Sequence, residues 1–233
     1  MDIGDRMKHQ YENRTRYFLP RRTYSIIRVD GKAFHTFTRG CEKPFDKDLA
    51  AALDFAAIRL CEEAQGVKFT YLQSDEISVL TTDFDDIKTD AWFDGNVQKI
   101  ASVAASVVTS AFNYHFEKRS DAVFDARVFT IPDPVEVENY FIWRQQDATR
   151  NSIQSVAQAH FSHKQLLGKN SDEMQEMLFR EHGVNWNDLD IYWKRGRSIL
   201  KEDIGWMVDR NIPVFTAERD YLRTRIKSMV EVV

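Results

Sequence analysis

Apolar residues recur with two different periods along the first 130 positions of the chain, and each period predicts one kind of element. Four short runs are rich in β-branched and aromatic residues, which is typical of strands: residues 23–29, 67–73, 77–82 and 124–131. Two longer segments, 45–64 and 95–117, carry apolar residues at helical spacing and therefore predict helices. The resulting order β-α-β-β-α-β predicts a ferredoxin-like arrangement, which alone says little about activity.

Helical periodicity dominates beyond residue 132. One amphipathic helix is predicted from about residue 134 to 167, and a second at 171–183 has capping-box character at Ser171. We therefore expect an α+β fold. Residues 1–132 form its ferredoxin-like core, and residues 133–233 form a mostly helical extension packed on that core.

Size and charge fit one large domain without a general affinity for nucleic acid. The chain has 233 residues, 43% of them hydrophobic, and a formal net charge of −4. Contact with a polyanion would therefore depend on local basic clusters. Three clusters have this character, although each also fits an ordinary solvated face: Arg6, Lys8, Arg14, Arg16, Arg21 and Arg22; Lys194, Arg195 and Arg197; and Arg219, Arg223, Arg225 and Lys227.

Cysteine usage and the N-terminal segment bear on location. Cys41 and Cys61 have no spacing typical of a zinc site or a disulfide framework, which fits free thiols in a reducing compartment. The N-terminus lacks the apolar stretch of a signal peptide, and the weakly polar run 101–112 is too short to span a bilayer. We expect a cytoplasmic protein with no membrane contact.

Two predicted strands are followed by a carboxylate beside a small residue, at Asp30-Gly31 and at Ser74-Asp75. The first and third strands of a ferredoxin-like sheet are neighbours, so Asp30 and Asp75 are expected to meet, with Glu76 as a third acid. Adjacent carboxylates repel and raise each other's pKa unless they share a proton or bind a divalent cation. Oxygen ligands alone favour Mg²⁺, and two such ions would suit an in-line phosphoryl transfer. Asp30 by itself also fits a turn residue.

Basic groups near these acids are candidate nucleotide ligands. Arg28 shares a strand face with Asp30, and Lys99 is expected near the positive end of the second helix, a ready anion site. The full set of candidates is Arg28, Lys32, His35, Lys43 and Lys99. Each of them alone fits an ordinary structural or surface role equally well.

Six motifs in order resemble those of the tRNA-His guanylyltransferase superfamily, the reverse-direction (3′-5′) nucleotide polymerases. They are RVDGKAFHTFT at 28–38, KPFD at 43–46, YLQSDEISVL at 71–80, KIAS at 99–102, FDARVF at 124–129 and WRQQDATRNSI at 143–153. The resemblance implies a polymerase-like palm in residues 1–132. It also implies that residues 133–233 contribute to tRNA binding and to a homotetramer.

The resemblance also implies roles for individual residues. Two Mg²⁺ ions per active site would be held by Asp30, Gly31 and Asp75, and the catalytic acids would be Asp30, Asp75 and Glu76. Positions around the nucleotides are Arg28, Lys32, Ala33, Phe34, His35, Lys43, Asp46, Ser74 and Lys99. Positions that support the site or bind tRNA are Arg144, Gln145, Asp147, Arg150 and Asn151. Lys194 and Arg195 join the tRNA-binding set because they stand beside aromatic residues, a mixture that suits RNA.

The reaction implied is addition of nucleotides to the 5′ end of tRNA after activation of that end with ATP or GTP. Members that add a single G to tRNA-His carry a His-Ile-Asn run where this chain reads Thr149-Arg150-Asn151. The chain is therefore more similar to the bacterial and archaeal branch, which repairs 5′-truncated tRNAs by template-dependent addition of any NTP.

Three other functions remain open at this stage. The first is single-G addition to tRNA-His. The second is a nucleotidyl cyclase, which would use the same palm and metals without a basic RNA surface. The third is a ferredoxin-like RNA-binding module, which would show exposed aromatic residues on its central strands rather than acids at strand ends.

Overall fold

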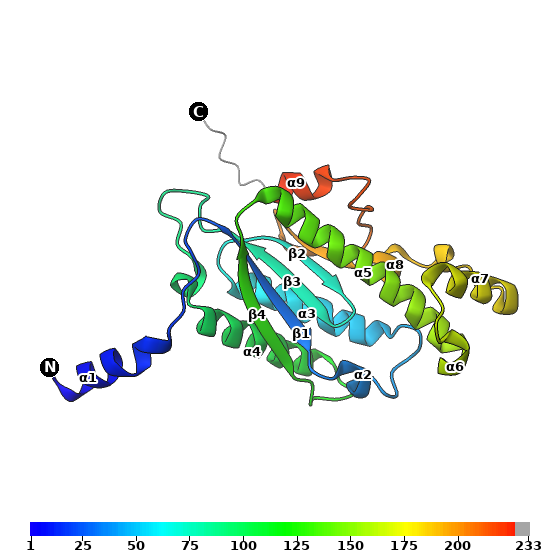
Figure 1. Ribbon diagram of the computed structural model, residues 1–233, viewed down its shortest axis with the longest axis horizontal. Helices are drawn as coiled ribbons and strands as arrows, with labels where there is room; N and C mark the ends of the chain where they lie inside the picture. The colour runs from blue at the N-terminus through cyan, green and yellow to red at the C-terminus, as the bar shows by residue number, and fades with distance from the viewer. Residues whose placement is uncertain (227–233) are drawn as a thin grey trace.

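A six-stranded antiparallel sheet forms the centre of the protein, in the order β4-β1-β3-β2-β5-β6 (Figure 1). The structure is a computed structural model that describes residues 1–226, so Lys227 of the third basic cluster lies outside the described residues. The strands are β1 (Tyr24–Gly31), β2 (Val67–Gln73), β3 (Glu76–Thr81), β4 (Phe124–Ile131), β5 (Arg197–Glu202) and β6 (Gly205–Asp209).

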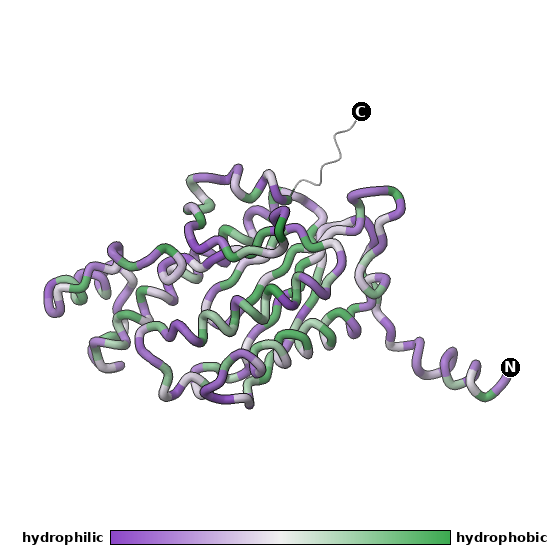
Figure 2. Tube along the Cα trace, turned by 180° about the vertical axis from the view of Figure 1, so that it is seen from behind, coloured by the Kyte–Doolittle hydropathy of each residue, from purple (hydrophilic) through white to green (hydrophobic). Residues whose placement is uncertain are grey.

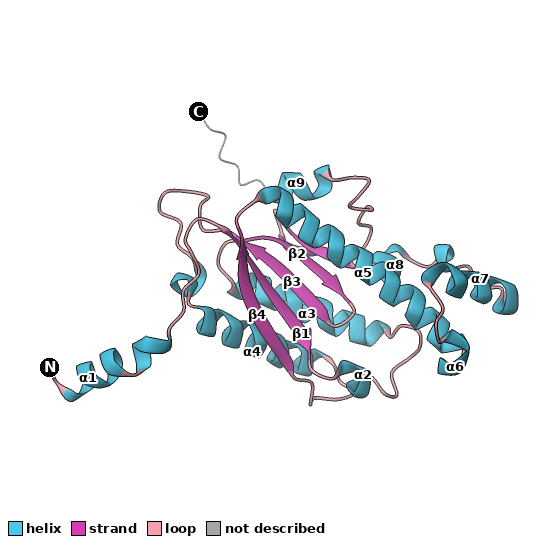
Figure 3. Ribbon diagram, viewed as in Figure 1, coloured by secondary structure: helices cyan, strands magenta, loops and turns pink. Residues whose placement is uncertain are grey.

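Helices lie on both faces of this sheet (Figure 3). The α-helices are α1 (Ile3–Gln10), α2 (Phe34–Phe37), α3 (Lys47–Glu63), α4 (Val97–His115), α5 (Pro134–His160), α6 (His163–Leu166), α7 (Ser171–His182), α8 (Ile191–Arg195) and α9 (Asp220–Ile226). Short 3₁₀ turns are η1 (Glu12–Thr15), η2 (Trp92–Gly95) and η3 (Trp186–Asp188). Among the described residues, no helix is long and apolar enough to cross a membrane.

The two faces of the sheet carry separate hydrophobic cores. Successive strand residues point to opposite faces, so Ile27 packs with α3 and α4, whereas Ile26 packs with α5 and α9. Figure 2, seen from the α3 and α4 side, shows hydrophobic stretches along the strands and these helices and a mostly hydrophilic N-terminal segment. Helix α1 accordingly buries no residue and projects from the body.

The predicted β-α-β-β-α-β order is confirmed, with β1 and β3 side by side at the centre of the four strands of the core. Helix α4 begins at Val97 because the Asn96 side chain accepts a hydrogen bond from the Lys99 backbone N–H. The helix expected over 134–167 ends earlier, at His160, and Ser162 starts the separate turn α6.

The extension is not helical throughout, because β5 and β6 form a hairpin that adds to the edge of β2. The only apolar residues at the centre of β5 are Ile199 and Leu200, a run too short to predict a strand by periodicity. The strand forms because Ile199 pairs with Thr70 and Arg197 pairs with Leu72 on β2. The local sequence does not specify these contacts. The extension and the core therefore share one sheet.

One buried ion pair joins α5 to the sheet. The Arg144 side chain on α5 donates from Nε to Glu76 Oε1 at 2.8 Å and from Nη2 to Glu76 Oε2 at 2.9 Å. Glu76 is 5% exposed and Arg144 is 4% exposed. Both charges are shielded from water and need compensation, which each supplies to the other together with Arg28 beside Glu76 and Asp147 beside Arg144.

Replacing Arg144 by Met is expected to lower the free energy of unfolding by about 3 kcal/mol, because Glu76 would lose its bidentate partner inside the protein. Denaturant unfolding would measure the change. Arg150→Met, on the exposed side of the same helix, is the matched control and should stay within about 0.5 kcal/mol of the wild type. Equal stability of both variants would show that the buried pair does not hold α5.

Candidate functional site

The acids of the two strand-end motifs lie next to each other at one end of the sheet. Asp30 at the end of β1 pairs with Glu76 at the start of β3, and Asp75 precedes Glu76 in the hairpin turn. Burial, with a smaller contribution from the charge of Asp30, raises the pKa of Asp75 to about 6. The hydroxyl of Ser74, which donates to Asp75 Oδ1 at 2.9 Å, opposes that increase. The structure thus brings together two carboxylates that favour a proton or a cation between them.

Glu76 lies next to this pair in the sheet, and its negative charge is compensated by two arginines. Besides the two hydrogen bonds from Arg144, its Oε2 is 3.0 Å from Arg28 Nε. Arg28 Nη2 in turn is 3.5 Å from Asp30 Oδ2. The third acid is therefore an anchor for two guanidinium groups, one of which reaches Asp30.

Gly31 and the residues after it form a tight turn over an aromatic cluster. A Cβ at Gly31 would lie 2.1 Å from the Phe34 ring, so only glycine fits there. Phe34 is 6% exposed and packs on Phe37 and Phe124. Ala33 adopts a left-handed conformation with φ of 53° before α2, and Lys32 is exposed. The turn is thus fixed by packing beside the acids.

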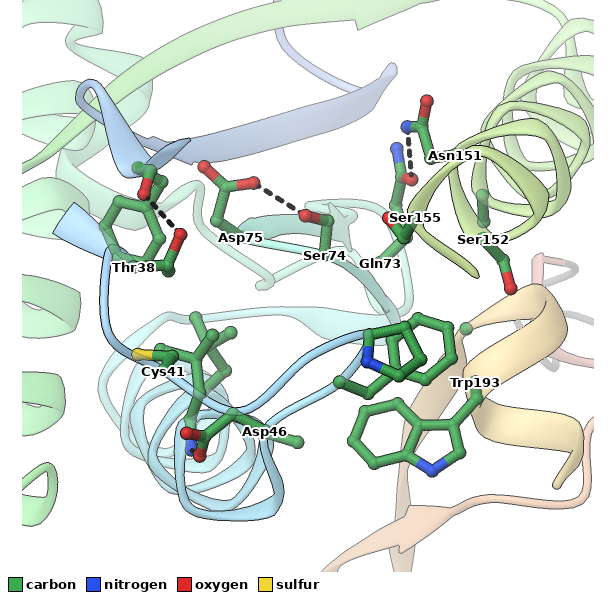
Figure 4. Close-up of a pocket in the computed structure, with 18 of the residues that line it drawn as sticks. Thr38, Cys41, Asp46, Gln73, Ser74, Asp75, Asn151, Ser152, Ser155 and Trp193 are labelled. Atoms are coloured by element: carbon green, nitrogen blue, oxygen red, sulfur yellow. Dashed lines mark hydrogen bonds between the residues drawn. The ribbon is translucent and has the colours of Figure 1, made fainter. Parts of the chain in front are cut away.

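A cavity of about 350 Å³ opens next to the hairpin tip (Figure 4). Its wall comes from four parts of the chain: residues 34–53, the β2-β3 turn, the middle of α5, and α8 with the start of β5. Seven of the residues expected in the site line it: Phe34, His35, Lys43, Asp46, Ser74, Asp75 and Asn151. The volume lies in the range of small-molecule sites.

Asp46 supports this cavity through its backbone contacts. Its carboxylate accepts hydrogen bonds from the backbone N–H groups of Glu42, Asp48 and Leu49 at 3.0 Å each, and from Lys118 Nζ at 2.8 Å. Although burial acts in the opposite direction, these donors lower the pKa of Asp46 to about 2. Asp46 therefore caps α3 and fixes the 42–46 loop.

Lys99 does not join the other candidates. The N-terminus of α4 contacts Phe18 and Leu19, whereas its C-terminal part bonds to the backbone of Phe124, which pairs with Gly31. Lys99 therefore lies at the end of the sheet opposite Asp30. This corrects the expected position of Lys99 near the acids, which required α4 to run in the other direction.

The residues expected on α5 form a hydrogen-bonded chain. Asp147 accepts from Arg144 at 2.8 Å and from the exposed Arg150 at 2.7 Å. The amide of Asn151 approaches Gln73 Oε1 at 3.5 Å, and Gln73 Nε2 approaches Asp147 at 3.4 Å. Arg144 is an internal ligand of Glu76, so Arg150 is the arginine that this helix presents to the surface.

Residues on and beside α8 hold it against the sheet. The carbonyl oxygen of Arg195 accepts a hydrogen bond from Tyr71 Oη at 2.7 Å. Lys194 Nζ donates to the carbonyl of Asn187 and lies 5.8 Å from the centre of the Trp186 ring.

Gln145, the remaining polar residue expected on α5, bonds to the backbone of residues 213 and 215 and is buried.

The sequence analysis missed several residues that line the cavity. Gln73 is 3% exposed and links the hairpin to α5, and its position beside Ser74-Asp75 was the available signal. Phe45 stacks on Trp193, with ring centres 4.8 Å apart and planes 6° apart. No local pattern could have predicted this stack, because its partners come from distant parts of the chain.

Comparisons with known proteins agree with the resemblance drawn from the motifs. A family model described as tRNAHis guanylyltransferase (Thg1) matches residues 4–132. The tRNA(His) guanylyltransferase of Debaryomyces hansenii is 30% identical over 214 residues, which cover 83% of this chain and 78% of that protein.

Solved structures extend the likeness over almost the whole chain. A bacterial tRNA(His) guanylyltransferase (Thg1)-like protein in complex with ATP has 49% identity and a TM-score of 0.92, covering 97% of this chain and 100% of its own. One in complex with GTP has 45% identity and a TM-score of 0.85, covering 96% and 98%. The Saccharomyces cerevisiae tRNA(His) guanylyltransferase, 23% identical with a TM-score of 0.74, shares the fold. The family match covers more than half of the chain, and this protein therefore belongs to the tRNA-His guanylyltransferase family, a family of nucleotidyltransferases.

Proposed function

We propose that this enzyme adds nucleotides in the 3′-5′ direction to the 5′ end of truncated tRNA, copying the opposite strand of the acceptor stem. The observation that carries the proposal is the pair Asp30 and Asp75 beside the cavity, with the pKa of Asp75 raised to about 6. Such a pair of carboxylates suits phosphoryl transfer, in which bound cations would stabilise the developing negative charge. Thr149-Arg150-Asn151, in place of His-Ile-Asn, favours repair of several tRNAs over single-G addition to tRNA-His.

The donor set fits magnesium. Asp30, Asp75 and the Gly31 carbonyl would hold two Mg²⁺ ions, which when bound would neutralise the developing charge on the transferred phosphoryl group. Within residues 1–226, no three Asp, Glu, His or Cys side chains group into a metal cage. Two carboxylates and a carbonyl leave room for substrate phosphates and water, as Mg²⁺ prefers.

The cavity is the proposed site for the nucleotide that activates the 5′ end. Because similar proteins are solved with ATP or with GTP, we propose that it accepts both. His35, Lys43 and Ser74 line it and can donate hydrogen bonds to phosphate oxygens. Arg28, held by Glu76, keeps a positive charge against Asp30. Glu76 is thus a positioning residue in this proposal.

The proposed reaction has two displacements at phosphorus. The 5′-phosphate oxygen of the tRNA attacks the α-phosphorus of ATP, and pyrophosphate leaves. The 3′-hydroxyl oxygen of the incoming NTP then attacks the 5′-phosphorus, losing its proton as AMP leaves. A 5′-triphosphate end enters at the second step and releases pyrophosphate. Asp75 would act in this step as a metal ligand, and the proton of the hydroxyl would pass to water.

The tRNA surface in this proposal is basic and lies on the extension. Arg150, which is 63% exposed in its side chain, and the neighbouring α8 residues Lys194 and Arg195 would contact tRNA phosphates. By resemblance to the family we also propose a homotetramer located in the cytoplasm.

The direct test uses tRNA that lacks its first 5′ nucleotide, with Mg²⁺ and all four NTPs. We expect the labelled 5′ end to lengthen by the complement of the opposing base, because template pairing selects the incoming NTP. A matched tRNA with that base changed should change the added nucleotide. Addition of G whatever the base would support single-G addition instead, and a cyclic nucleotide with unchanged tRNA would support a cyclase.

Asp75→Asn is expected to abolish nucleotide addition and yet stabilise the metal-free protein. The raised pKa means that ionised Asp75 weakens the fold above about pH 6, that this cost shrinks as the pH falls toward 4, and that it is absent below 4. The variant should therefore gain on the order of 2 kcal/mol at pH 7 and nothing at pH 3.5. Asp90→Asn, at an exposed acid distant from the site, should change neither property. Destabilisation of Asp75→Asn at pH 7 without metal would contradict the assignment.

Acid should raise the Mg²⁺ requirement of the enzyme. Below pH 6 a proton competes with the cation for Asp75, so the Mg²⁺ concentration for half-maximal addition should rise by about tenfold per pH unit. Titrations of Mg²⁺ at pH 7.5, 6 and 5 with a 5′-triphosphorylated tRNA would measure this. A requirement that stays constant over that range would mean that Asp75 does not bind the metal.

A further inference from the structure

Arg197 is a buried arginine at the wall of the cavity that the proposed reaction leaves without a role. It is the first residue of β5, is 3% exposed, and lines the cavity together with Gly196. Gly196 has φ of 79°, and a Cβ there would lie 2.4 Å from the Leu72 carbonyl oxygen. Glycine therefore lets the chain between α8 and β5 lie directly against β2. This close contact fixes the position of Arg197.

The guanidinium of Arg197 is anchored on one side. Its Nε donates to Asp54 Oδ1, and its Nη2 donates to the Ala50 carbonyl at 3.1 Å. Asp54 is itself buried and also accepts from Arg210 Nη2 at 2.7 Å. Over residues 1–226 no acceptor is found for Arg197 Nη1. Two guanidinium groups share one carboxylate, so this cluster keeps a net positive charge and a free donor.

The surroundings of this donor suit a flat heterocycle better than a phosphate. Trp193, four residues before Arg197, stacks on Phe45, and both rings line the cavity. Asp75 and Trp193 lie on different sides of the cavity in Figure 4. Phosphates would lie near Asp75 and the proposed metals, which leaves the aromatic side for the base. Among base atoms, an arginine can bond only to acceptors.

We propose that Arg197 orients a purine nucleotide in this cavity by donating from Nη1 to purine N7, with Asp54 as its positioning residue. Adenine and guanine share the N7 acceptor, and arginine pairs with purine N7 in nucleic-acid recognition. The inference rests on the proposed function, because it assumes that the cavity binds a nucleoside triphosphate. It adds a base-recognising residue to that site.

The test measures equilibrium binding of ATP, GTP and their 7-deaza analogues, in which carbon replaces N7, to the full chain without tRNA. The wild type should bind ATP and GTP roughly tenfold more tightly than the analogues, as expected for a charged hydrogen-bond donor. Arg197→Met should weaken the binding of ATP and GTP by about the same factor, and it should bind the analogues as tightly as the wild type does. Asp54→Asn should reduce the N7 preference, because it releases the anchor.

Arg210→Met is the matched control, since Arg210 bonds Asp54 from outside the cavity and should leave the N7 preference intact. In Arg197→Met the buried Asp54 keeps Arg210 as its partner. If that variant does not fold, the wild type alone decides, because equal affinity for the purines and their 7-deaza analogues would overturn the inference. If Arg197→Met bound the purines and the 7-deaza analogues more weakly by the same factor, its contact would be with the sugar or the phosphate, and the inference would be overturned. Unchanged binding would leave Arg197 a structural residue and also overturn it. Absence of nucleotide binding by the wild type would instead contradict the proposed function.

Discussion

The bidentate ion pair between Glu76 and Arg144 is the contact on which the rest of the site depends. It crosses from the central strand β3 to α5 in a region shielded from water, where an uncompensated charge is costly. Arg28 on β1 joins the same carboxylate, so one acid ties three elements together. Asp75 precedes Glu76 in the hairpin turn and Asp30 pairs with Glu76 across the sheet, so both acids are adjacent to this ion pair.

The cavity next to those acids is assembled from both halves of the chain. The core supplies the 34–53 segment and the hairpin tip, whereas the extension supplies α5, α8 and the start of β5. The core supplies the acid Asp75 at one side of the cavity, and at another side Trp193 of the extension stacks on Phe45 of the core. A ligand with a charged end and a flat end fits this division.

Sequence periodicity predicted the core elements well because each carries a long enough pattern of its own. The meeting of Asp30 and Asp75 followed from topology, since β1 and β3 must be neighbours in that fold. Lys99 was misplaced although that topology specifies its position: β3 starts beside the acids and runs away from them, so the helix after it begins at the opposite end of the sheet. The β5-β6 hairpin and the Arg197-Asp54 pair were missed for a different reason. Both depend on contacts between distant residues, which no local window contains.

The sequence separation in that last pair has a consequence for how the protein matures. Asp54 and Arg197 are 143 positions apart, yet their contact holds an arginine that lines the cavity. During synthesis the first four strands can pair while the extension is still being made, because domains fold progressively from the N-terminus. The nascent chain would then expose Asp30 and Asp75 before the cavity is complete. Activity is therefore expected only after that long loop has closed, because the cavity lacks α5, α8 and the start of β5 until then.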